Sequence, residues 1–272
     1  MTTIDARNFY ETIEVISVNG VHKTKQRIDH MIIKTLLAGV FLSFGGLLLL
    51  TVGAGSTPIV QNLGSSIHKM IQGSVFPIGF VLIVITGADL FTGNTMVLMI
   101  STLHRKTTWL DLLISWIVSF FGNLAGCLFF QYIFVYYAGL LSNDPFRSFT
   151  VQLAETKATS SRELYSKIIS IYLPISCFIT VGYEHSIANM FTVQMGMILG
   201  ANLSITKYIL HVLIPVTLGN IIGGGIFVGF VYFYLNLLNK FKIDTKTNGR
   251  SVANDVYQTV EQHDDLDLSQ QP

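Results

Sequence analysis

Two polar interruptions at matching places in long apolar segments constrain this chain most. The first, Gly87-Ala-Asp-Leu-Phe-Thr-Gly-Asn94, lies near the middle of an apolar segment of residues 70–99. The second, Gly182-Tyr-Glu-His-Ser-Ile-Ala-Asn189, interrupts an apolar segment of residues 168–203. Each has a glycine, then an acid two residues later, then an asparagine five residues after the acid. Such matched breaks predict two related membrane-embedded halves, each built around one broken helix.

A second motif, Gly-Asn followed three residues later by glycine, comes after each interruption. It occupies residues 121–126 in the first half and 218–223 in the second. The spacing from the asparagine of the interruption to the asparagine of this motif agrees within two residues between the halves. The chain therefore contains an internal repeat.

Composition places this repeat in a membrane. Half of the residues are hydrophobic and 12% are charged, whereas a soluble domain has about 25% charged residues. The formal net charge of +1 gives no reason to expect a nucleic acid partner. Cys127 and Cys177 both lie in apolar runs, so we interpret them as buried hydrophobic residues and expect neither a disulfide nor a metal pair.

The expected fold is all-α, a polytopic helical bundle in the membrane. A helix needs roughly 20 apolar residues to cross the hydrocarbon, and five apolar segments are long enough, at residues 35–52, 70–99, 110–141, 168–203 and 208–238. Basic residues precede the first span and follow the last, which predicts both chain termini in the cytoplasm. An odd number of spans cannot satisfy that prediction.

The repeat shows the same deficit. The first half has a plain helix before its broken helix, whereas the second half has only the polar stretch 142–167 at the equivalent place. One helix is therefore expected to be missing, and it would belong between Ala158 and Lys167. We divide the chain into a cytoplasmic N-terminal segment (1–31), a membrane transport domain (32–240) and a disordered cytoplasmic tail (241–272). The transport domain comprises repeat one (32–141) and the incomplete repeat two (168–239).

Three ionisable residues lie at membrane depth: Asp89, Glu184 and His185. Each costs roughly 2.5–3.5 kcal/mol at a helix centre, so each marks a pathway or a specific partner. The matched positions of the two acids favour a shared structural role, capping half-helices by accepting hydrogen bonds from free backbone N–H groups. His185 differs, because Leu90 stands at its repeat-equivalent position and the fold itself requires no histidine there. We interpret it as functional.

Other kinds of site have little support in the sequence. No second histidine or cysteine lies at metal-ligand spacing from His185, so zinc is not expected. A Gly-x-Ser-x-Gly motif is absent, and we expect no enzyme and no cofactor. Thr92 and Asn94 can present a hydroxyl and an amide to a bound anion.

The chain resembles the formate/nitrite transporter family in four runs, residues 86–94, 153–158, 182–191 and 215–224. This resemblance implies an aquaporin-like inverted repeat and a homopentamer in which each protomer has its own pore. It also implies passage of small monovalent anions or their acids, namely formate, nitrite, acetate, lactate or hydrosulfide. The expected location is the plasma membrane, with the lipid bilayer, the anion and a proton as partners.

The resemblance also implies roles for individual residues. His185 matches the central proton donor, and Asn189 matches its polar neighbour. Lys157 and Lys34 match the outer and inner vestibule lysines. The remaining matches form the loop of the first broken helix and the apolar constrictions, and they are Leu90, Phe91, Thr92, Phe76, Phe80 and Phe178. The anion would take a proton inside the pore, where its charge costs most, and cross as a neutral acid.

Family members have six spans, and this chain shows no fourth. Two alternatives to a transporter therefore stay open. One is a truncated, non-transporting subunit of the same family. The other is a channel for a neutral solute, against which His185 and the vestibule lysines both count.

Overall fold

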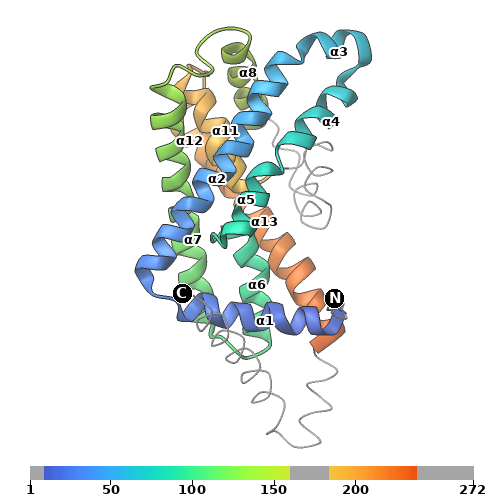
Figure 1. Ribbon diagram of the computed structural model, residues 1–272, viewed down its shortest axis with the longest axis vertical. Helices are drawn as coiled ribbons and strands as arrows, with labels where there is room; N and C mark the ends of the chain where they lie inside the picture. The colour runs from blue at the N-terminus through green and yellow to red at the C-terminus, as the bar shows by residue number, and fades with distance from the viewer. Residues whose placement is uncertain (1–8, 160–183, 238–272) are drawn as a thin grey trace, which may run out of the picture.

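The computed structural model describes residues 9–159 and 184–237, which are almost entirely helical (Figure 1). Within these residues four helices are long and apolar enough to cross a membrane, at Ile28–Gly55, Ser65–Thr86, Trp109–Tyr136 and Ile205–Leu235, and Phe91–Leu103 is a shorter apolar helix. The predicted helical membrane bundle is thus confirmed. Phe178, Cys177, the site of the expected missing helix and the tail from 241 onward lie outside the described residues.

The helices follow one another in an order that shows the two halves. The first half contains α1 (Phe9–Lys25), α2 (Ile28–Gly55), α3 (Thr57–Leu63), α4 (Ser65–Val75), α5 (Ile78–Thr86), α6 (Phe91–Leu103), α7 (Trp109–Phe130) and η1 (Gln131–Tyr136). The described part of the second half contains α8 (Phe146–Thr159), α11 (Ser186–Ile198), α12 (Ile205–Tyr208), η2 (Ile209–Leu213), α13 (Ile214–Ile221), η3 (Ile222–Phe230) and η4 (Phe233–Leu237).

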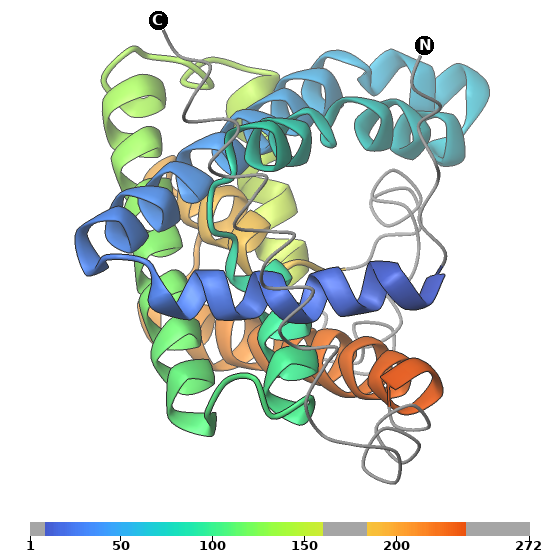
Figure 2. The same cartoon turned by 60° about the horizontal axis from the view of Figure 1, so that its bottom comes forward.

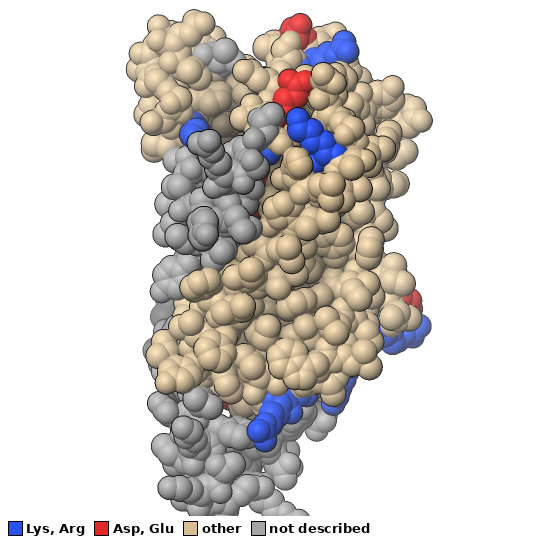
Figure 3. All heavy atoms as spheres, turned by 180° about the vertical axis from the view of Figure 1, so that it is seen from behind, with Lys and Arg blue, Asp and Glu red and all other residues tan. Residues whose placement is uncertain are grey.

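The outer surface of the bundle suits lipid. Val84 and Ile85 are 77% and 76% exposed, although both lie in the middle of the apolar segment 70–99. On the face shown in Figure 3, charged side chains gather toward the two ends and leave an uncharged band between them. A surface of this kind is stable in hydrocarbon and unfavourable in water.

Glycines bring α2 and α7 into backbone contact at the centre of the bundle. A Cβ on Gly126 would lie 2.0 Å from the carbonyl oxygen of Leu36, and one on Gly39 would lie 2.2 Å from that of Asn123. Only glycine fits such an approach, which is the usual way in which membrane helices pack closely. This contact holds the residues of the first interruption against α7.

Two further helices cover opposite ends of the bundle. The helix α1 lies across one end, roughly perpendicular to the spans, and α8 lies at the other (Figures 1 and 2). We call these the α1 end and the α8 end. At the α1 end Ile13 packs with Ile100, Phe233 and Leu237. The helix α8 was not expected from the polar stretch 142–167, and it packs on α11 through small residues, since Gly196 lies against Ala154.

The first predicted helix interruption is confirmed. Gly87 has a left-handed backbone (φ 64°) that ends α5, and Leu90 is extended before α6 begins at Phe91. The second interruption has the same form where it is described, because His185 is extended before α11 begins at Ser186. Leu90 (φ −89°, ψ 128°) and His185 (φ −120°, ψ 126°) thus occupy equivalent places in the two repeats.

Candidate functional site

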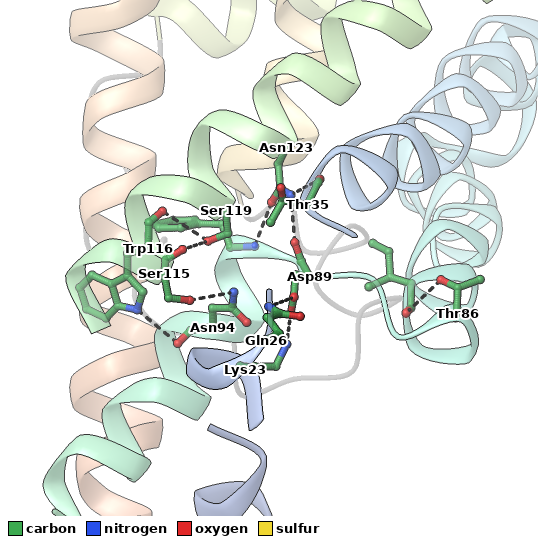
Figure 4. Close-up of polar contacts among 12 residues, drawn as sticks. Lys23, Gln26, Thr35, Thr86, Asp89, Asn94, Ser115, Trp116, Ser119 and Asn123 are labelled. Atoms are coloured by element: carbon green, nitrogen blue, oxygen red, sulfur yellow. Dashed lines mark hydrogen bonds and ion pairs between the residues drawn. The ribbon is translucent and has the colours of Figure 1, made fainter. Parts of the chain in front are cut away.

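Asn123 of the Gly-Asn motif forms hydrogen bonds with backbone groups of the first interruption. Its Oδ1 accepts a hydrogen bond from the backbone N–H of Phe91 (2.9 Å), the first residue of α6. Its Nδ2 donates to the carbonyl oxygens of Asp89 (3.0 Å) and Thr35 (2.6 Å) (Figure 4). One side chain therefore satisfies a free donor and free acceptors at a break inside the membrane, where water cannot.

Asn220 does the same for the second interruption. Its Oδ1 accepts from the backbone N–H of Ser186 (2.9 Å), and its Nδ2 donates to the carbonyl oxygen of Glu184 (3.3 Å). The equivalence of Asn123 and Asn220 extends the repeat from the sequence to individual hydrogen bonds. The sequence showed both asparagines at matched positions, but it gave no signal that their side chains would reach the half-helices.

The two buried acids pair with lysines and do not cap the half-helices, which corrects the expectation for Asp89 and Glu184. Lys157 Nζ, from α8, donates to Glu184 Oε2 (2.6 Å), and Asn189 Nδ2 donates to the same oxygen (2.7 Å). The first N–H of α6 and of α11 is already taken, since Asn123 and Asn220 accept from them.

At the α1 end the partner of Asp89 is Lys23, which the sequence analysis did not single out. Lys23 Nζ donates to Asp89 Oδ1, and Gln26 Nε2 donates to Asp89 Oδ2 (2.9 Å) (Figure 4). Lys34, the expected inner vestibule lysine, has an exposed side chain on α2, and only its carbonyl oxygen contacts the break, through the N–H of Asp89 (3.2 Å). Lys23 was overlooked because it lies in a polar N-terminal segment.

His185 and Thr92 join the two halves at the centre of the site. Thr92 Oγ1 lies 2.9 Å from His185 Nε2, while His185 Nδ1 accepts from the backbone N–H of Ala188 (3.2 Å). An imidazole nitrogen that accepts an N–H bond carries no proton, so neutral His185 carries its proton on Nε2 and donates it to Thr92. His185 is also the N-cap of α11, so its ring both contacts Thr92 and caps a half-helix.

The aromatic residues divide into two groups. Phe80 lies edge-on to the His185 ring, with ring centroids 5.4 Å apart, and Phe76 lies 5.8 Å from Phe80. The structure thus brings two expected constriction residues into line with the histidine. Phe91 instead packs on Phe120 (5.4 Å) and is buried in the same apolar core as Leu90.

Asn94 and Asn189 hold equivalent backbone positions and make different side-chain bonds. The N–H of Asn94 donates to the carbonyl oxygen of Leu90, and the N–H of Asn189 donates to that of His185, both at 3.0 Å. Asn189 binds Glu184. Asn94 Nδ2 instead reaches Ser115 Oγ at 3.4 Å, and Asn94 Oδ1 is buried without a hydrogen-bond partner.

These features define a helical membrane channel or transporter. In each half a helix begins directly after an extended residue, with a lysine–acid pair beside that start, and a buried histidine–threonine pair joins the halves. Within the part of the chain that the structure describes, no three histidine, cysteine or acidic side chains gather as a metal site would require.

Comparisons with known proteins give the family. The model of the formate/nitrite transporter family matches residues 10–163 and 149–234. A probable formate transporter of Methanothermobacter thermautotrophicus is 32% identical, and the alignment covers 84% of this chain and 96% of that protein. The formate channel FocA of Escherichia coli strain K12 is 29% identical over 80% of this chain and 90% of its own length. The chain belongs to the formate/nitrite transporter family, whose members are channels and transporters rather than enzymes.

Solved structures agree in fold. An ion channel of this family superposes with a TM-score of 0.73 at 24% identity, over 83% of this chain and 98% of the other. A pentameric formate channel with formate bound has a TM-score of 0.64 at 25% identity, over 76% of this chain and 97% of the other. The relatives vary in length, because formate-nitrite transporter 3 of Toxoplasma gondii is 35% identical but has only 49% of its length covered.

The matches are interrupted near the expected missing helix. The family model matches this chain in two separate pieces, which overlap at residues 149–163. The alignment with the Methanothermobacter protein is 266 positions long, but it includes only 84% of the 272 residues of this chain, which is fewer residues than the alignment has positions. The Methanothermobacter protein therefore contains residues with no counterpart here. The repeat also indicates that the second half is shorter than the first, because Lys23 and Asp89 are 66 residues apart whereas Lys157 and Glu184 are only 27 apart.

Proposed function

We propose that this chain provides a membrane pathway for a small monovalent anion, formate or nitrite first, that crosses as its neutral acid. Acetate, lactate and hydrosulfide are the further candidates. The observation that carries the proposal is the buried His185–Thr92 pair, which lies between two lysine–acid pairs. The formate transporters and channels among the relatives support the choice of substrate.

The lysines act first in the proposed mechanism. Lys23 and Lys157 each stand beside a buried acid, so an anion that approaches either lysine finds an oriented ammonium group. The attraction weakens with salt, since partly exposed charges are screened. As the anion moves deeper it loses water, and its affinity for a proton rises because the charged form is disfavoured.

The tautomer of His185 limits how it can supply that proton. Neutral His185 has one ring proton, on Nε2, and loss of it would leave an unstable imidazolate. A proton given to the anion must therefore follow a gain of a proton at Nδ1, which breaks the bond from the N–H of Ala188. Proton supply by His185 is thus coupled to uncapping of α11, and Thr92 Oγ1 supplies a hydroxyl at the transfer point.

The experiment is formate uptake into liposomes that contain the purified chain, with an imposed pH gradient. Flux should rise as the external pH falls. In His185→Asn the side chain can still cap α11 but cannot take a proton, so we expect loss of the pH dependence together with at least about a tenfold fall in flux. Full, pH-dependent flux from this variant would remove the histidine from the mechanism. Thr206→Ser, on α12, is a control for reconstitution.

A second candidate function, a non-transporting subunit, is favoured by one observation. The lysine and the acid are 27 residues apart in the second repeat and 66 apart in the first, and α2, of 28 residues, fills part of the longer interval. A pore wall equivalent to α2 would then be absent from the second half. The chain alone would show no formate flux above empty liposomes, whereas a transporter would show flux that saturates or depends on pH.

The assembly and the orientation complete the proposal. A similar channel is pentameric, and we infer the same homopentamer for this chain, to be tested by mass measurement of the protein in lipid nanodiscs. We place it in the plasma membrane with the α1 end and both termini in the cytoplasm. A reporter tag at either terminus that an impermeant protease cleaves in intact cells would overturn this orientation.

A further inference from the structure

The two breaks agree in backbone and differ in which amide holds the acid. At the α8 end Asn189 Nδ2 donates to Glu184 Oε2 (2.7 Å). At the α1 end the corresponding Asp89 Oδ2 accepts from Gln26 Nε2 (2.9 Å), and Gln26 follows α1 directly. An amide from the end of another helix therefore occupies the place that the repeat gives to an asparagine.

Asn94 has the geometry to make the missing bond. It follows Asp89 by five residues, as Asn189 follows Glu184, and its backbone makes the same first-turn hydrogen bond at the same 3.0 Å. The residues before both half-helices are extended. Because the spacing of acid and asparagine and the first-turn backbone match between the halves, rotation of the Asn94 side chain would turn its Nδ2 toward Asp89, whose side chain is one methylene shorter than that of Glu184.

Asn94 is also poorly satisfied where it now points. Its Nδ2 lies 3.4 Å from Ser115 Oγ, beyond the usual length of a strong hydrogen bond. Its Oδ1 has no partner, and the residue is 3% exposed. Figure 4 shows its side chain directed toward Ser115. A buried amide left unpaired costs free energy, so the present arrangement of Asn94 is not held by strong bonds of its own side chain.

We propose that Asp89 has two competing amide partners, Gln26 and Asn94, and that Asn94 takes over the carboxylate when Lys23 and Gln26 turn away to receive an anion at the α1 end. Lys23 and Gln26 are three residues apart, so they leave Asp89 together and present an ammonium and an amide to the same anion. Without Asn94 the buried carboxylate would lose its donors at that moment. The receiving role rests on the proposed function, whereas the exchange of partners does not.

The test is a double-mutant cycle in the full chain in nanodiscs, read by amide hydrogen exchange over residues 87–91. Gln26→Ala leaves Asn94 as a substitute, and Asn94→Ala leaves Gln26 in place, so each single change should raise the exchange rate only slightly. The double variant leaves Asp89 Oδ2 without an amide donor. The increase in its exchange rate should exceed the product of the two single increases by roughly tenfold. A double effect equal to that product overturns the exchange.

A matched control uses the same glutamine with the other asparagine. Gln26→Ala and Asn189→Ala act on different breaks, so their effects on exchange should multiply without coupling. If Asn94→Ala does not fold, Asn94→Ser replaces it, because a serine hydroxyl is too short to reach Asp89.

Hydrogen exchange measured with and without sodium formate separates this proposal from the proposed function. Sodium formate should raise exchange over residues 9–25 in the parent chain as Lys23 and Gln26 leave Asp89, and it should do so less in Asn94→Ala. A coupled cycle with no response to formate keeps the exchange and overturns the anion-receiving role. A response to formate with an uncoupled cycle keeps the anion pathway and overturns the exchange.

Discussion

At the scale of single residues, the site is ordered by side chains that satisfy backbone groups at the two breaks. Asn123, Asn220 and His185 accept the N–H groups that begin α6 and α11. The sequence predicted the breaks and the buried acids, and the functional role of His185 stays a prediction. The sequence could not predict that asparagines more than thirty residues away would reach the half-helices, and for that reason the acids were wrongly expected to be their caps.

Removal of Lys157 should leave the buried carboxylate of Glu184 without its cationic partner. The side chain of Glu184 is 10% exposed, and Lys157 is its only cationic partner among the described residues. Lys157→Met should therefore destabilise the protein by about 3 kcal/mol, the usual effect of breaking a buried ion pair. Thermal unfolding in detergent measures the loss. Lys157→Met combined with Glu184→Gln should recover most of it, and a double variant no more stable than the single one would show that the pair is not coupled.

His104 makes the α1 end sensitive to acid. Its Nδ1 lies 2.8 Å from Ser17 Oγ of α1, and Glu14 and Lys106 flank it. Burial lowers the pKa of His104 below its ordinary 6.5, partly offset by Glu14 and reinforced by Lys106. The unfolded chain then binds a proton at higher pH than the folded chain does, so stability is complete above pH 6.5 and falls as the pH drops through the lowered pKa.

The check is thermal unfolding of the parent chain and His104→Gln between neutral pH and about pH 5. The parent should lose more stability than the variant over that interval, since glutamine does not titrate. Equal losses would assign the acid sensitivity to other groups.

At the scale of helices, the structure adds an element that the sequence did not predict. The helix α8 lies in a stretch of mixed charge, where apolar periodicity is weak, and its fit to α11 depends on small residues such as Thr150, Ala154 and Gly196. The sequence did predict α2 and α7 as spans. It underestimated α2, which starts at Ile28 rather than near residue 35, because charged residues continue the helix beyond the apolar part.

The contact between α2 and α7 should tolerate no added methyl group at its closest point. A Cβ on Gly126 would lie 2.0 Å from the backbone oxygen of Leu36. Gly126→Ala should force the helices apart and destabilise the protein by about 1–3 kcal/mol. Gly55→Ala, at the end of α2 with open space around its Cβ, is the control and should be neutral or stabilising by up to about 1 kcal/mol. Similar melting temperatures for both variants would mean that the helices do not meet here.

At the scale of the whole molecule, the repeat shows which parts of the two halves correspond and where the two halves differ in length. In both halves a lysine from a helix at one end of the bundle pairs with a buried acid. An asparagine, Asn123 or Asn220, donates to the backbone carbonyl oxygen of that acid, and we call it the clamping asparagine. Acid and clamping asparagine are 34 residues apart in one half and 36 in the other, whereas lysine and acid are 66 and 27 apart. The shortfall is therefore confined to one interval, which contains the stretch between Ala158 and Lys167 where span parity and the repeat together predict the missing helix.

That interval should limit transport, and restoring it should restore flux. In the first half α2 packs backbone to backbone on α7 and supplies the carbonyl oxygen of Thr35 to the clamping Asn123. We expect that grafting the corresponding segment of the Methanothermobacter protein between residues 159 and 168 raises formate flux in liposomes by at least about tenfold, since it completes the second pore wall. A polar linker of equal length is the control, because it lengthens the chain without a helix to pack. Flux in the parent chain equal to that of the graft would show that a separation of 27 residues from Lys157 to Glu184 suffices for a working pore.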